Sequence, residues 1–566
     1  MTHRLPVVLL WHMHQPQYRD ALTGQYVLPW TYLHAIKDYT DMAAHLEANP
    51  AARAVVNFTP VLIEQLEALS TRIADHLSSG APLPNPVLNL LGPDPVPQDA
   101  GERLDLLKSC LRAQRKQMIE RFGPYLELAT IAEVLATPER ARYASQQLIH
   151  DLAVWYHLAW IGETVRRSNP LITALTDQGR DFTPAQRKQL LALIGELVGA
   201  IVPRFRRLSE TGQCELSVTP YGHPIVPLLF DFQSARDAVP GMVLPEHANY
   251  PGGAERAAWH VEEGLRVFTE AFGVRPKGCW PSEGAISRPT LELLDKAGFR
   301  WAATSTNVLR GSLPTEQAQN PLSFNRPYAL PGSRLNCFFR DDALSDLIGF
   351  TYATWHGDDA ANNLVHEVQQ LVQRYQDSPD HAVLIALDGE NAWEYYPFNG
   401  YYFLKALYAG LASHPEIELL TLSECVARGI QPAPLQRVSA GSWVHGTLAT
   451  WMGDPAKNRA WDLLCAAKVE FDRVVRSGVL LNDEARLAAT RQLALCESSD
   501  WFWWFGDYNP QEAVSQFDQL FRRQLIVLYR MLGLSPPENL AQPISTGRVG
   551  STDTAEAGGV MRRAHA

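Results

Sequence analysis

The chain has 566 residues, of which 46% are hydrophobic and 20% are charged, and it carries a formal net charge of -11. This length allows more than one hydrophobic core. The negative charge argues against nucleic-acid and anionic-membrane partners, because those need clustered lysines and arginines, and no apolar run is long enough to cross a bilayer.

Short apolar runs alternate with amphipathic stretches over the first three quarters of the chain. The apolar runs predict strands at residues 7–11, 54–57, 215–219, 278–280, 301–304, 336–339, 383–387 and 418–421. Helical patterns lie between them, including residues 253–272, 288–297, 362–376 and 401–413. Unbroken apolar strands joined by long crossovers are typical of parallel sheets. We therefore predict an α/β protein with a β/α barrel, whose functional residues lie at the C-terminal ends of the strands.

Two further regions interrupt or follow this pattern. Helical stretches at 101–121, 139–166 and 184–209 predict a helical insertion over about residues 100–212, after a proline-rich loop at 80–99. The barrel with this insertion is assigned to residues 1–432. Helical patterns at 457–477, 483–496 and 510–532 predict an all-helical domain over residues 433–540. The polar residues 541–566, rich in Gly, Ser and Thr, predict a disordered tail.

The stretch WHMHQPQY, residues 11–18, lies at the end of the first predicted strand. His12 and His14 alternate, so on a strand both imidazoles point to the same side. A packed turn, a metal pair and a sugar-binding site are each compatible with this pattern, because imidazole binds zinc as well as hydroxyl groups. No cysteine lies nearby, and the closest acid, Asp20, follows a proline in a predicted loop, so we predict no metal.

Two carboxylates also follow short predicted strands. Glu283 lies in GCWPSEGAIS, and Asp388 comes directly after the apolar run of VLIALDGENAWEYYP. Burial at the mouth of a strand raises the pKa of a carboxyl group, as a general acid requires near neutral pH. Two carboxyl groups that face each other across a cleft are the minimum for glycoside hydrolysis. The alternative is that either carboxylate is a helix cap or an ion-pair partner.

Tryptophan is the residue type that stands out in the composition. Many of the 15 tryptophans stand beside Gly, Pro, Asp or Asn, where loops are expected. Loop tryptophans in this number indicate stacking on flat ligand faces such as those of sugars, although core packing is the alternative for each one. Trp443 and Trp451, in GSWVHGTLATWMGDP, are additional candidates of this kind.

With these residues in view, the chain resembles glycoside hydrolase family 57, a family of α-amylases, amylopullulanases, branching enzymes and 4-α-glucanotransferases. Five segments resemble the family's motifs in order: HMHQP (12–16), PYGHPIVPLL (220–229), GCWPSEGAIS (278–287), LDGENAWEYYP (387–397) and ESSDWFWWFGDY (497–508). The resemblance runs from Leu9 to about Asp507. It implies an incomplete (β/α)7 barrel with a helical insertion, followed by a C-terminal all-helical domain that completes the active site.

The resemblance also implies roles for individual residues. Glu283, in the third motif, would be the nucleophile of a retaining mechanism, and Asp388, in the fourth, would be the general acid/base. The residues implied to bind substrate are His12, His14, Gln15, His223, Trp280, Glu390, Asp500 and Trp503. The implied partner is an α-glucan oligosaccharide or polysaccharide, and no cofactor takes part.

The motifs also bear on which member of the family the chain resembles. Branching enzymes carry Leu-Pro after the two histidines, whereas this chain has Gln15-Pro16. Its third and fourth motifs are most similar to the amylopullulanase and α-amylase types. We therefore predict a retaining hydrolase of α-1,4 bonds in glycogen or maltodextrin, with α-1,6 bonds left open. The alternatives are a 4-α-glucanotransferase, a non-catalytic glucan-binding protein and a zinc-dependent deacetylase or mannosidase on a related barrel.

The cysteines and the N-terminus predict where the protein works. The seven cysteines are scattered and contain no C-x-x-C pair, which is typical of a reducing compartment. The N-terminus has no basic region followed by an apolar one, as a signal peptide would. We therefore expect a cytoplasmic protein, and the sequence makes no prediction of its oligomeric state.

Overall fold

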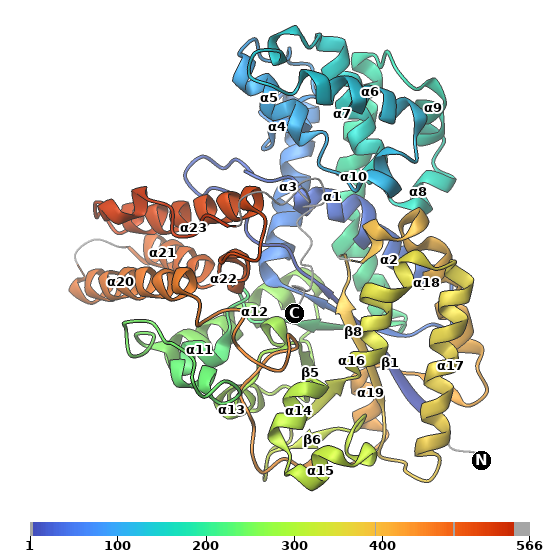
Figure 1. Cartoon of the computed structure of the whole chain (residues 1–566), viewed down its shortest axis with the longest axis vertical. Coiled ribbons are helices and arrows are strands. Elements are labelled where there is room, and N and C mark those ends of the chain that lie inside the picture. The colour runs from blue at the N-terminus through green and yellow to red at the C-terminus, as the bar shows by residue number, and fades with distance from the viewer. Residues whose placement is uncertain (1–3, 391, 479–481, 548–566) are drawn as a thin grey trace.

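In the computed structural model of the protein, which describes residues 4–390, 392–478 and 482–547, a parallel barrel lies at the centre of the molecule (Figure 1). Its seven strands are β1 (Leu5–Met13), β2 (Ala54–Phe58), β3 (Cys214–Val218), β4 (Gly278–Cys279), β5 (Trp301–Ser305), β7 (Asn336–Arg340) and β8 (Val383–Asp388). They neighbour one another in this order, and β8 pairs with both β7 and β1, which closes the ring. The (β/α)7 barrel predicted from the sequence is thereby confirmed.

Three short strands extend the sheet outside the ring. The strand β9 (Ile417–Leu419) pairs with the start of β1, and it corresponds to the strand predicted at 418–421. The strand β6 (Tyr328–Ala329) runs antiparallel to β7, and β10 (Ala433–Pro434) pairs with β6. Neither β6 nor β10 was predicted, because two residues are too few to produce a recognisable pattern.

The barrel strands are apolar throughout because helices cover their outer faces and side chains fill the ring. Along β1, Val8 and Leu10 belong to the cluster inside the ring, whereas Leu9 and Trp11 pack outward against the helices. Side chains alternate along a strand. The inward row of β1 therefore continues from Leu10 to His12.

The same alternation brings other polar residues to this end of the ring. The inward row of β8 contains Leu384 and Ala386 and continues to Asp388, the last residue of the strand. The inward row of β2 contains Val55 and continues to Asn57. The ring is thus filled by apolar side chains in its middle and lined by polar ones at the C-terminal ends of its strands.

Helices connect the barrel strands along the outside of the ring. They are α1 (Trp30–His34), α2 (Thr40–Glu47), α3 (Pro60–Ser79), α11 (Val226–Phe230), α12 (Gly253–Phe272), α13 (Arg288–Lys296), α14 (Thr306–Ser312), α15 (Thr315–Gln319), α16 (Asp342–Asp346), α17 (Gly357–Tyr375), α18 (Tyr401–Ser413) and α19 (Leu422–Ala427). The bounds of α12 and α18 coincide with the predicted ones. The helix α17 extends the helical pattern predicted at 362–376 back to Gly357, and the acids of HGDDAANN (356–363) mark its start as their charge predicts, since Asp358 and Asp359 occupy its first turn.

A helical insertion lies between β2 and β3 and forms the upper part of the molecule in Figure 1. Its helices are α4 (Pro86–Asn89), α5 (Ala100–Ser109), α6 (Gly123–Leu135), α7 (Gln146–Trp160), α8 (Glu163–Ser168), α9 (Pro170–Gln178) and α10 (Pro184–Glu210). The long helix α10 leads back to β3 and packs on α3. Within the stretch predicted to be a loop, Asn85 caps the single turn of α4.

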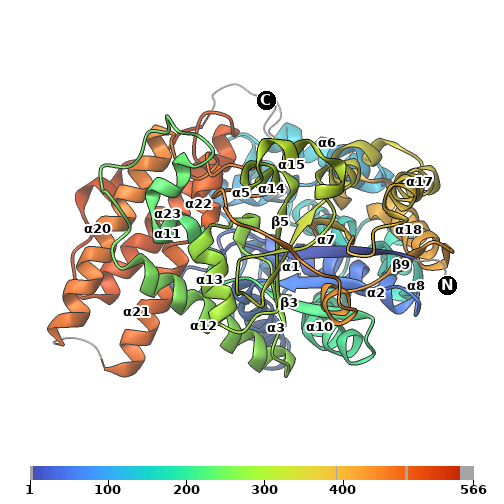
Figure 2. The same ribbon diagram turned by 90° about the horizontal axis from the view of Figure 1, so that it is seen from below.

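The C-terminal helices stand together at one side of the barrel, as both views show (Figures 1 and 2). They are α20 (Pro455–Ser477), α21 (Asp483–Cys496), α22 (Ser499–Trp504) and α23 (Gln511–Met531). Residues 541–547 pack against them, since Ile544 is buried and its N–H donates to Asp518. The rest of the predicted disordered tail, residues 548–566, lies outside the described residues. None of the helices described is both long and apolar enough to span a membrane.

Candidate active site

The polar ends of β1, β2 and β8 meet at one edge of the barrel. His12 pairs in register with Asn57 on one side and with Asp388 on the other. The Nδ1 atom of His12 lies 2.6 Å from Oδ1 of Asn57. Two residues that the sequence predicted for the site, His12 and Asp388, thus lie side by side on adjacent strands.

Glu283 lies in a short helical turn, Ser282–Gly284, that follows β4. Its φ of 56° and ψ of 24° fall in the left-handed region, which costs a residue other than glycine about 1–3 kcal/mol. A neighbouring segment holds the turn in place. Gly441 and Ile286 exchange backbone hydrogen bonds, and the N–H of Trp443 donates to the carbonyl of Glu283 over 3.1 Å.

The carboxylate of Glu283 is buried, with 3% of the residue exposed. The indole Nε1–H of Trp443 donates to its Oε2 over 3.0 Å. Burial and the charge of Asp388 raise the pKa of Glu283 well above its usual range, while hydrogen bonds from Trp443 and Ser499 lower it. Both carboxyl groups lie around His12: Asp388 pairs with His12 in register, and the ring of Trp443, which donates to Glu283, has its centre 6.4 Å from that of His12.

His12, His14 and His223 form a stack of imidazole rings beside these carboxylates. The rings of His14 and His223 are nearly parallel, with centroids 3.8 Å apart, and those of His12 and His223 lie 5.3 Å apart. The Nε2 atoms of His12 and His223 are separated by 3.2 Å, the distance of a hydrogen bond. Burial, reinforced by the neighbouring histidines, lowers the pKa of His12 to about 3 and that of His223 well below its usual range. Both are therefore neutral near pH 7 and offer hydrogen bonds, not positive charge.

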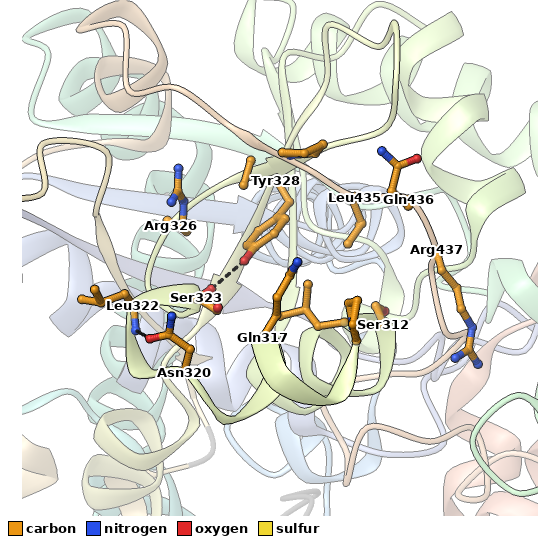
Figure 3. Close-up of a pocket in the computed structure, with 14 residues that line it drawn as sticks. Ser312, Gln317, Asn320, Leu322, Ser323, Arg326, Tyr328, Leu435, Gln436 and Arg437 are labelled. Atoms are coloured by element: carbon orange, nitrogen blue, oxygen red, sulfur yellow. Dashed lines mark hydrogen bonds between the residues drawn. The ribbon is translucent and has the colours of Figure 1, made fainter.

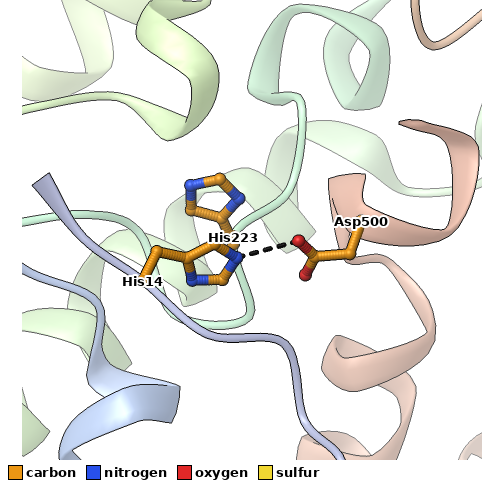
Figure 4. Close-up of side chains that lie close together, drawn as sticks. All are labelled: His14, His223 and Asp500. Carbon is orange, nitrogen blue, oxygen red and sulfur yellow. Dashed lines mark hydrogen bonds and ion pairs between the residues drawn. The ribbon is translucent and has the colours of Figure 1, made fainter. Parts of the chain in front are cut away.

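The helix α22 brings two side chains of the helical domain to this stack. Asp500 reaches His14, with Oδ1 2.9 Å from Nε2 (Figure 4). The Oγ atom of Ser499 lies 2.7 Å from Nδ1 of His223, and the backbone N–H of Ser499 donates to the carbonyl of His223. The strand ends and the helical domain therefore form one site.

A buried ionic cluster anchors the segment that leads into α22. Arg256, on the barrel helix α12, donates to both carboxylate oxygens of Glu497, at 2.8 Å from Oε1 and 2.6 Å from Oε2. Tyr250 and His260 also contact this carboxylate. Burial raises the pKa of Glu497, but the charge of Arg256 and the contact with His260 outweigh burial and lower it to about 2. The helical domain is thus tied to the barrel by a carboxylate that stays ionised.

The stack also has the composition of a metal site, because His14, His223 and Asp500 each place one ligand atom within 4.8 Å of the others. Zinc binds imidazole nitrogen at about 2.0–2.1 Å, with its ligands spread tetrahedrally. Two imidazoles on one such ion splay apart, whereas the rings of His14 and His223 stack with an angle of 15° between their planes. The Nε2 atom of His14 also faces Asp500 directly. This geometry fits hydrogen bonding better than metal coordination.

Gln15 and Glu390 contact each other near Asp388. The side-chain amide of Gln15 and the backbone N–H of His14 both donate to Oε1 of Glu390, each over 3.2 Å. Burial raises the pKa of Glu390 well above its usual range, and the charges of Asp388 and Asp38 raise it further. Asp388 therefore influences two buried carboxyl groups, Glu283 and Glu390.

The two predicted tryptophans differ from the other predicted residues, because they are packed inside the protein. Trp280 is fully buried in the cluster inside the ring, and its indole ring lies edge-on to Trp443 with centroids 5.0 Å apart. Trp503 is 9% exposed and packs near Trp451. Neither presents an open ring face, whereas Trp443 is half-buried and contacts Glu283.

The sequence did not single out Ser499, and it marked Trp443 only as one more aromatic candidate. Ser499 precedes Asp500 in the fifth motif, and this position beside a predicted residue was the available signal. Trp443 lies in a loop 160 positions after Glu283, and no sequence pattern connects the two.

A separate cavity of about 710 Å³ lies away from these residues (Figure 3). It is lined by residues of α14 and α15, by Tyr328 of β6 and by the segment from Ala433 to Arg437. Tyr328 pairs with Cys337 near the start of β7, and the candidate active site lies at the opposite ends of the strands. None of the predicted site residues lines this cavity.

Comparison with known proteins is in line with this geometry. Branching enzymes from Pyrococcus horikoshii and Thermococcus kodakaraensis both match with a TM-score of 0.58, at 15% and 14% identity. The matches cover 99% of this chain and 100% of the former enzyme, and 93% of this chain and 90% of the latter. An α-amylase from Thermotoga maritima matches with a TM-score of 0.56 at 13% identity, over 95% of this chain and 96% of that one. At such identities the likeness shows a shared fold.

The family follows from the sequence match. The model of glycosyl hydrolase family 57 matches residues 8–436, which is most of the chain and includes Glu283 and Asp388. The protein belongs to glycosyl hydrolase family 57.

Proposed function

We propose that the protein is a retaining α-glucan hydrolase that cleaves α-1,4 bonds of glycogen or maltodextrin, with Glu283 as nucleophile and Asp388 as general acid/base. One observation carries the proposal. Asp388 and the buried Glu283 both lie around His12 at the C-terminal end of the barrel, where the enzymes of this fold act. The proteins with similar folds are named as branching enzymes and an α-amylase, which supports the choice of α-glucans as substrates.

The proposed reaction has two displacements at the anomeric carbon. In the first, a carboxylate oxygen of Glu283 attacks this carbon, the bond to the leaving oxygen breaks, and Asp388 protonates that oxygen. In the second, Asp388 takes a proton from water, the water oxygen attacks the same carbon, and Glu283 is released. Such a mechanism requires carboxyl groups about 5–5.5 Å apart.

The hydrogen bonds around Glu283 support this division of roles. Each carboxylate disfavours ionisation of the other, so the pair retains a proton more readily than either group alone. Trp443 and Ser499 bond to Glu283 and favour its ionised form. The first displacement requires an ionised Glu283 and a protonated Asp388, and these two hydrogen bonds assist that division against the burial of Glu283.

The remaining predicted residues are proposed to bind the sugar around the scissile bond. His12 and His223 are neutral, and their Nδ1 atoms bond to Asn57 and Ser499, so a sugar hydroxyl would bind at Nε2 in place of the contact between the two rings. His14 is oriented by Asp500. Gln15 and Glu390 are joined by a hydrogen bond and lie near Asp388. Trp280 and Trp503, being buried, would shape the site by packing.

A 4-α-glucanotransferase is the second candidate, and the burial of the site favours it. Glu283, His12, His223 and Asp500 are each at most 3% exposed. Transfer uses the same glycosyl-enzyme but requires that a sugar hydroxyl reach it before water does, and a site that excludes water assists this.

Product analysis distinguishes these candidates. The protein is incubated with maltoheptaose, the products are separated by chain length, and reducing ends are counted. Shorter products with rising reducing ends support hydrolysis. Longer and shorter products together with constant reducing ends indicate transfer, and new α-1,6 linkages would indicate branching. Pullulan, assayed in the same way, tests cleavage of α-1,6 bonds.

Two controls accompany the assay. Glu283→Gln and Asp388→Asn should each abolish turnover, since each removes one of the two proposed catalytic groups. Prior dialysis against a chelator should leave turnover unchanged. Loss of activity that zinc restores would overturn the metal-free mechanism, and no turnover by the unmodified protein would overturn the α-glucan assignment.

A further inference from the structure

Four exposed aromatic residues, Phe350, Trp355, Phe398 and Tyr402, form what we call the aromatic patch. They are 53%, 40%, 39% and 40% exposed, respectively. Among the described residues between 323 and 468, they are the only large hydrophobic residues exposed to this degree, and none of the four is aliphatic. Exposed apolar groups that gather in one place mark binding surfaces more often than scattered ones do.

The patch is drawn from two loops: Phe350 and Trp355 lie in the loop before α17, and Phe398 lies in the loop before α18, whose first turn holds Tyr402. The rings of Phe398 and Tyr402 lie 5.5 Å apart and perpendicular to each other. Gly357 abuts Tyr402 so closely that a Cβ atom on it would lie 3.0 Å from the Cβ of Tyr402. Trp355 is two residues before Gly357, and its turn, Tyr352–Thr354, packs against the turn Pro397–Gly400 that carries Phe398.

Both loops belong to the end of the barrel that holds the candidate active site. One loop follows β7, and the other runs from Asp388, at the end of β8, to the start of α18. A glucan chain bound at Asp388 would therefore extend beside the loop that carries Phe398. The patch thus lies where a further part of the same polymer can reach it.

The backbone holds Phe398 in a fixed and strained position. Phe398 and Asn399 both have a φ of 54°, which is unfavourable for residues other than glycine. Both the oxygen and the nitrogen of the side-chain amide of Asn399 form hydrogen bonds. Lys37 donates to its Oδ1 over 3.1 Å, and its Nδ2 donates to Asp41 over 2.8 Å.

Arginines of the helical insertion lie over one face of the rings of Phe398 and Tyr402. The guanidinium carbon of Arg121 lies 4.6 Å from the ring centre of Phe398. Arg167 lies 5.1 Å from the ring centre of Tyr402 and donates to its hydroxyl over 3.1 Å. Flat rings beside hydrogen-bond donors suit a pyranose, which has apolar faces and a rim of hydroxyl groups.

We propose that the aromatic patch is a second α-glucan-binding site outside the active site, an inference that rests on the proposed function. The small size of the patch argues against a protein partner. A stable protein interface buries about 800 Å² on each partner, or some 20–30 residues, and the patch consists of four residues. A polysaccharide needs only a few stacked rings, because many neighbouring sugar units can occupy the same site.

The test compares binding of glycogen with turnover of a short substrate. The double variant Trp355→Ala/Tyr402→Ala removes two rings of the patch. A separate variant, Phe398→Gly, removes another ring, and glycine adopts the left-handed backbone conformation of this position without strain. Tyr143→Ala is the matched control, because Tyr143 is 71% exposed on the helical insertion and outside the patch. Binding is measured by affinity electrophoresis in glycogen gels, in a Glu283→Gln background so that the glycogen is not degraded. Turnover of maltotriose is measured in the active protein.

We expect both patch variants to bind glycogen about tenfold more weakly, as the loss of aromatic stacking implies. Their turnover of maltotriose should stay within about twofold of the unmodified protein, and Tyr143→Ala should change neither quantity. Unchanged glycogen binding by the patch variants, in a protein that cleaves maltotriose, would overturn this inference and leave the proposed function standing. A protein that neither binds nor cleaves glucans would overturn both. A dimer that the same substitutions dissociate would show that the patch joins two copies of the chain.

Discussion

Trp443 donates its indole N–H to Glu283, with Nε1 3.0 Å from Oε2, across 160 positions of sequence. The same tryptophan bonds through its backbone N–H to the carbonyl of Glu283. It belongs to the segment that connects the barrel to the C-terminal helices. This segment therefore fixes both the backbone and the carboxylate of the proposed nucleophile.

Replacing Trp443 by phenylalanine tests the value of the indole hydrogen bond. A hydrogen bond to a charged group is worth about 1.5–3 kcal/mol, so kcat/KM should fall roughly ten- to a hundredfold. The bond lowers the pKa of Glu283. Its loss should raise that pKa and move the acidic limb of the pH profile of kcat/KM to higher pH.

Trp451 offers a matched control for this substitution. It is fully buried, and its Nε1 has no hydrogen-bond partner among the described residues. Trp451→Phe removes the same atoms without breaking a hydrogen bond, so the pH profile should not move. An equal shift in both variants would mean that the indole of Trp443 acts through packing alone.

Asp500 tests the contribution of the helical domain to the site. Asp500→Ala removes the carboxylate that holds Nε2 of His14, and we expect kcat/KM to fall by about a hundredfold or more. Asp500→Asn keeps an oxygen at this position, so its kcat/KM should fall less than that of Asp500→Ala. The matched control is Asp507→Ala, in the same motif but exposed, which should retain full activity. Full activity in Asp500→Ala would contradict a role for α22 in the site.

Glu497 tests the anchor between the helical domain and the barrel. Glu497→Gln leaves Arg256 buried without its counter-charge, which should lower the free energy of unfolding by about 3–5 kcal/mol at pH 7. The folded pKa of about 2 lies below the unfolded value of about 4.3. The stabilisation is therefore complete above the unfolded pKa and is lost as the pH falls from about 4.3 to about 2.

Denaturant titrations at several pH values measure this effect. The difference between the unmodified protein and Glu497→Gln should be constant from pH 6 to about 8 and shrink below about pH 4.3. Glu292→Gln, which removes the exposed partner of Arg288, should cost less than about 1 kcal/mol. A pH-independent difference would show that Glu497 acts through packing and not through its charge.

The contribution of Glu390 to the stability of the folded protein should depend on pH in the opposite sense to that of Glu497. Its folded pKa is raised, so the folded protein binds this proton more tightly than the unfolded chain does. The stabilisation is complete below the unfolded pKa of about 4.3 and is lost as the pH rises through the folded pKa. Glu390→Gln mimics the protonated form and keeps the oxygen that accepts from Gln15. The melting temperature of Glu390→Gln minus that of the unmodified protein should increase from pH 5 to pH 8. A decrease of this difference over the same range would contradict the raised pKa of Glu390.

The sequence predicted those parts of the site that lie on regular strands. His12 and Asp388 each follow an apolar run, and strict alternation along a strand determines the side to which they point. Parallel strands then bring their C-terminal ends to one edge of the barrel. For these residues, local pattern and topology were sufficient.

Contacts made by irregular segments could not be predicted in this way. Trp443 reaches Glu283 from a loop whose path is determined by packing between the barrel and the helical domain. The burial of Trp280 depends on its neighbours inside the ring, and its sequence context is equally compatible with exposure. The positive φ of Glu283 likewise arises from pairing with residues 441–443, which no local signal reveals.

Trapping the glycosyl-enzyme tests the role of Glu283 as nucleophile most directly. A fluorinated α-glucosyl fluoride that forms the intermediate faster than it breaks down is incubated with the protein, and the labelled peptide is identified by mass spectrometry. We expect one sugar attached to Glu283, no label in Glu283→Gln, and slower breakdown of the labelled enzyme in Asp388→Asn. A label on another residue, or an active enzyme whose product has inverted anomeric configuration, would contradict the assignment of Glu283 as the nucleophile.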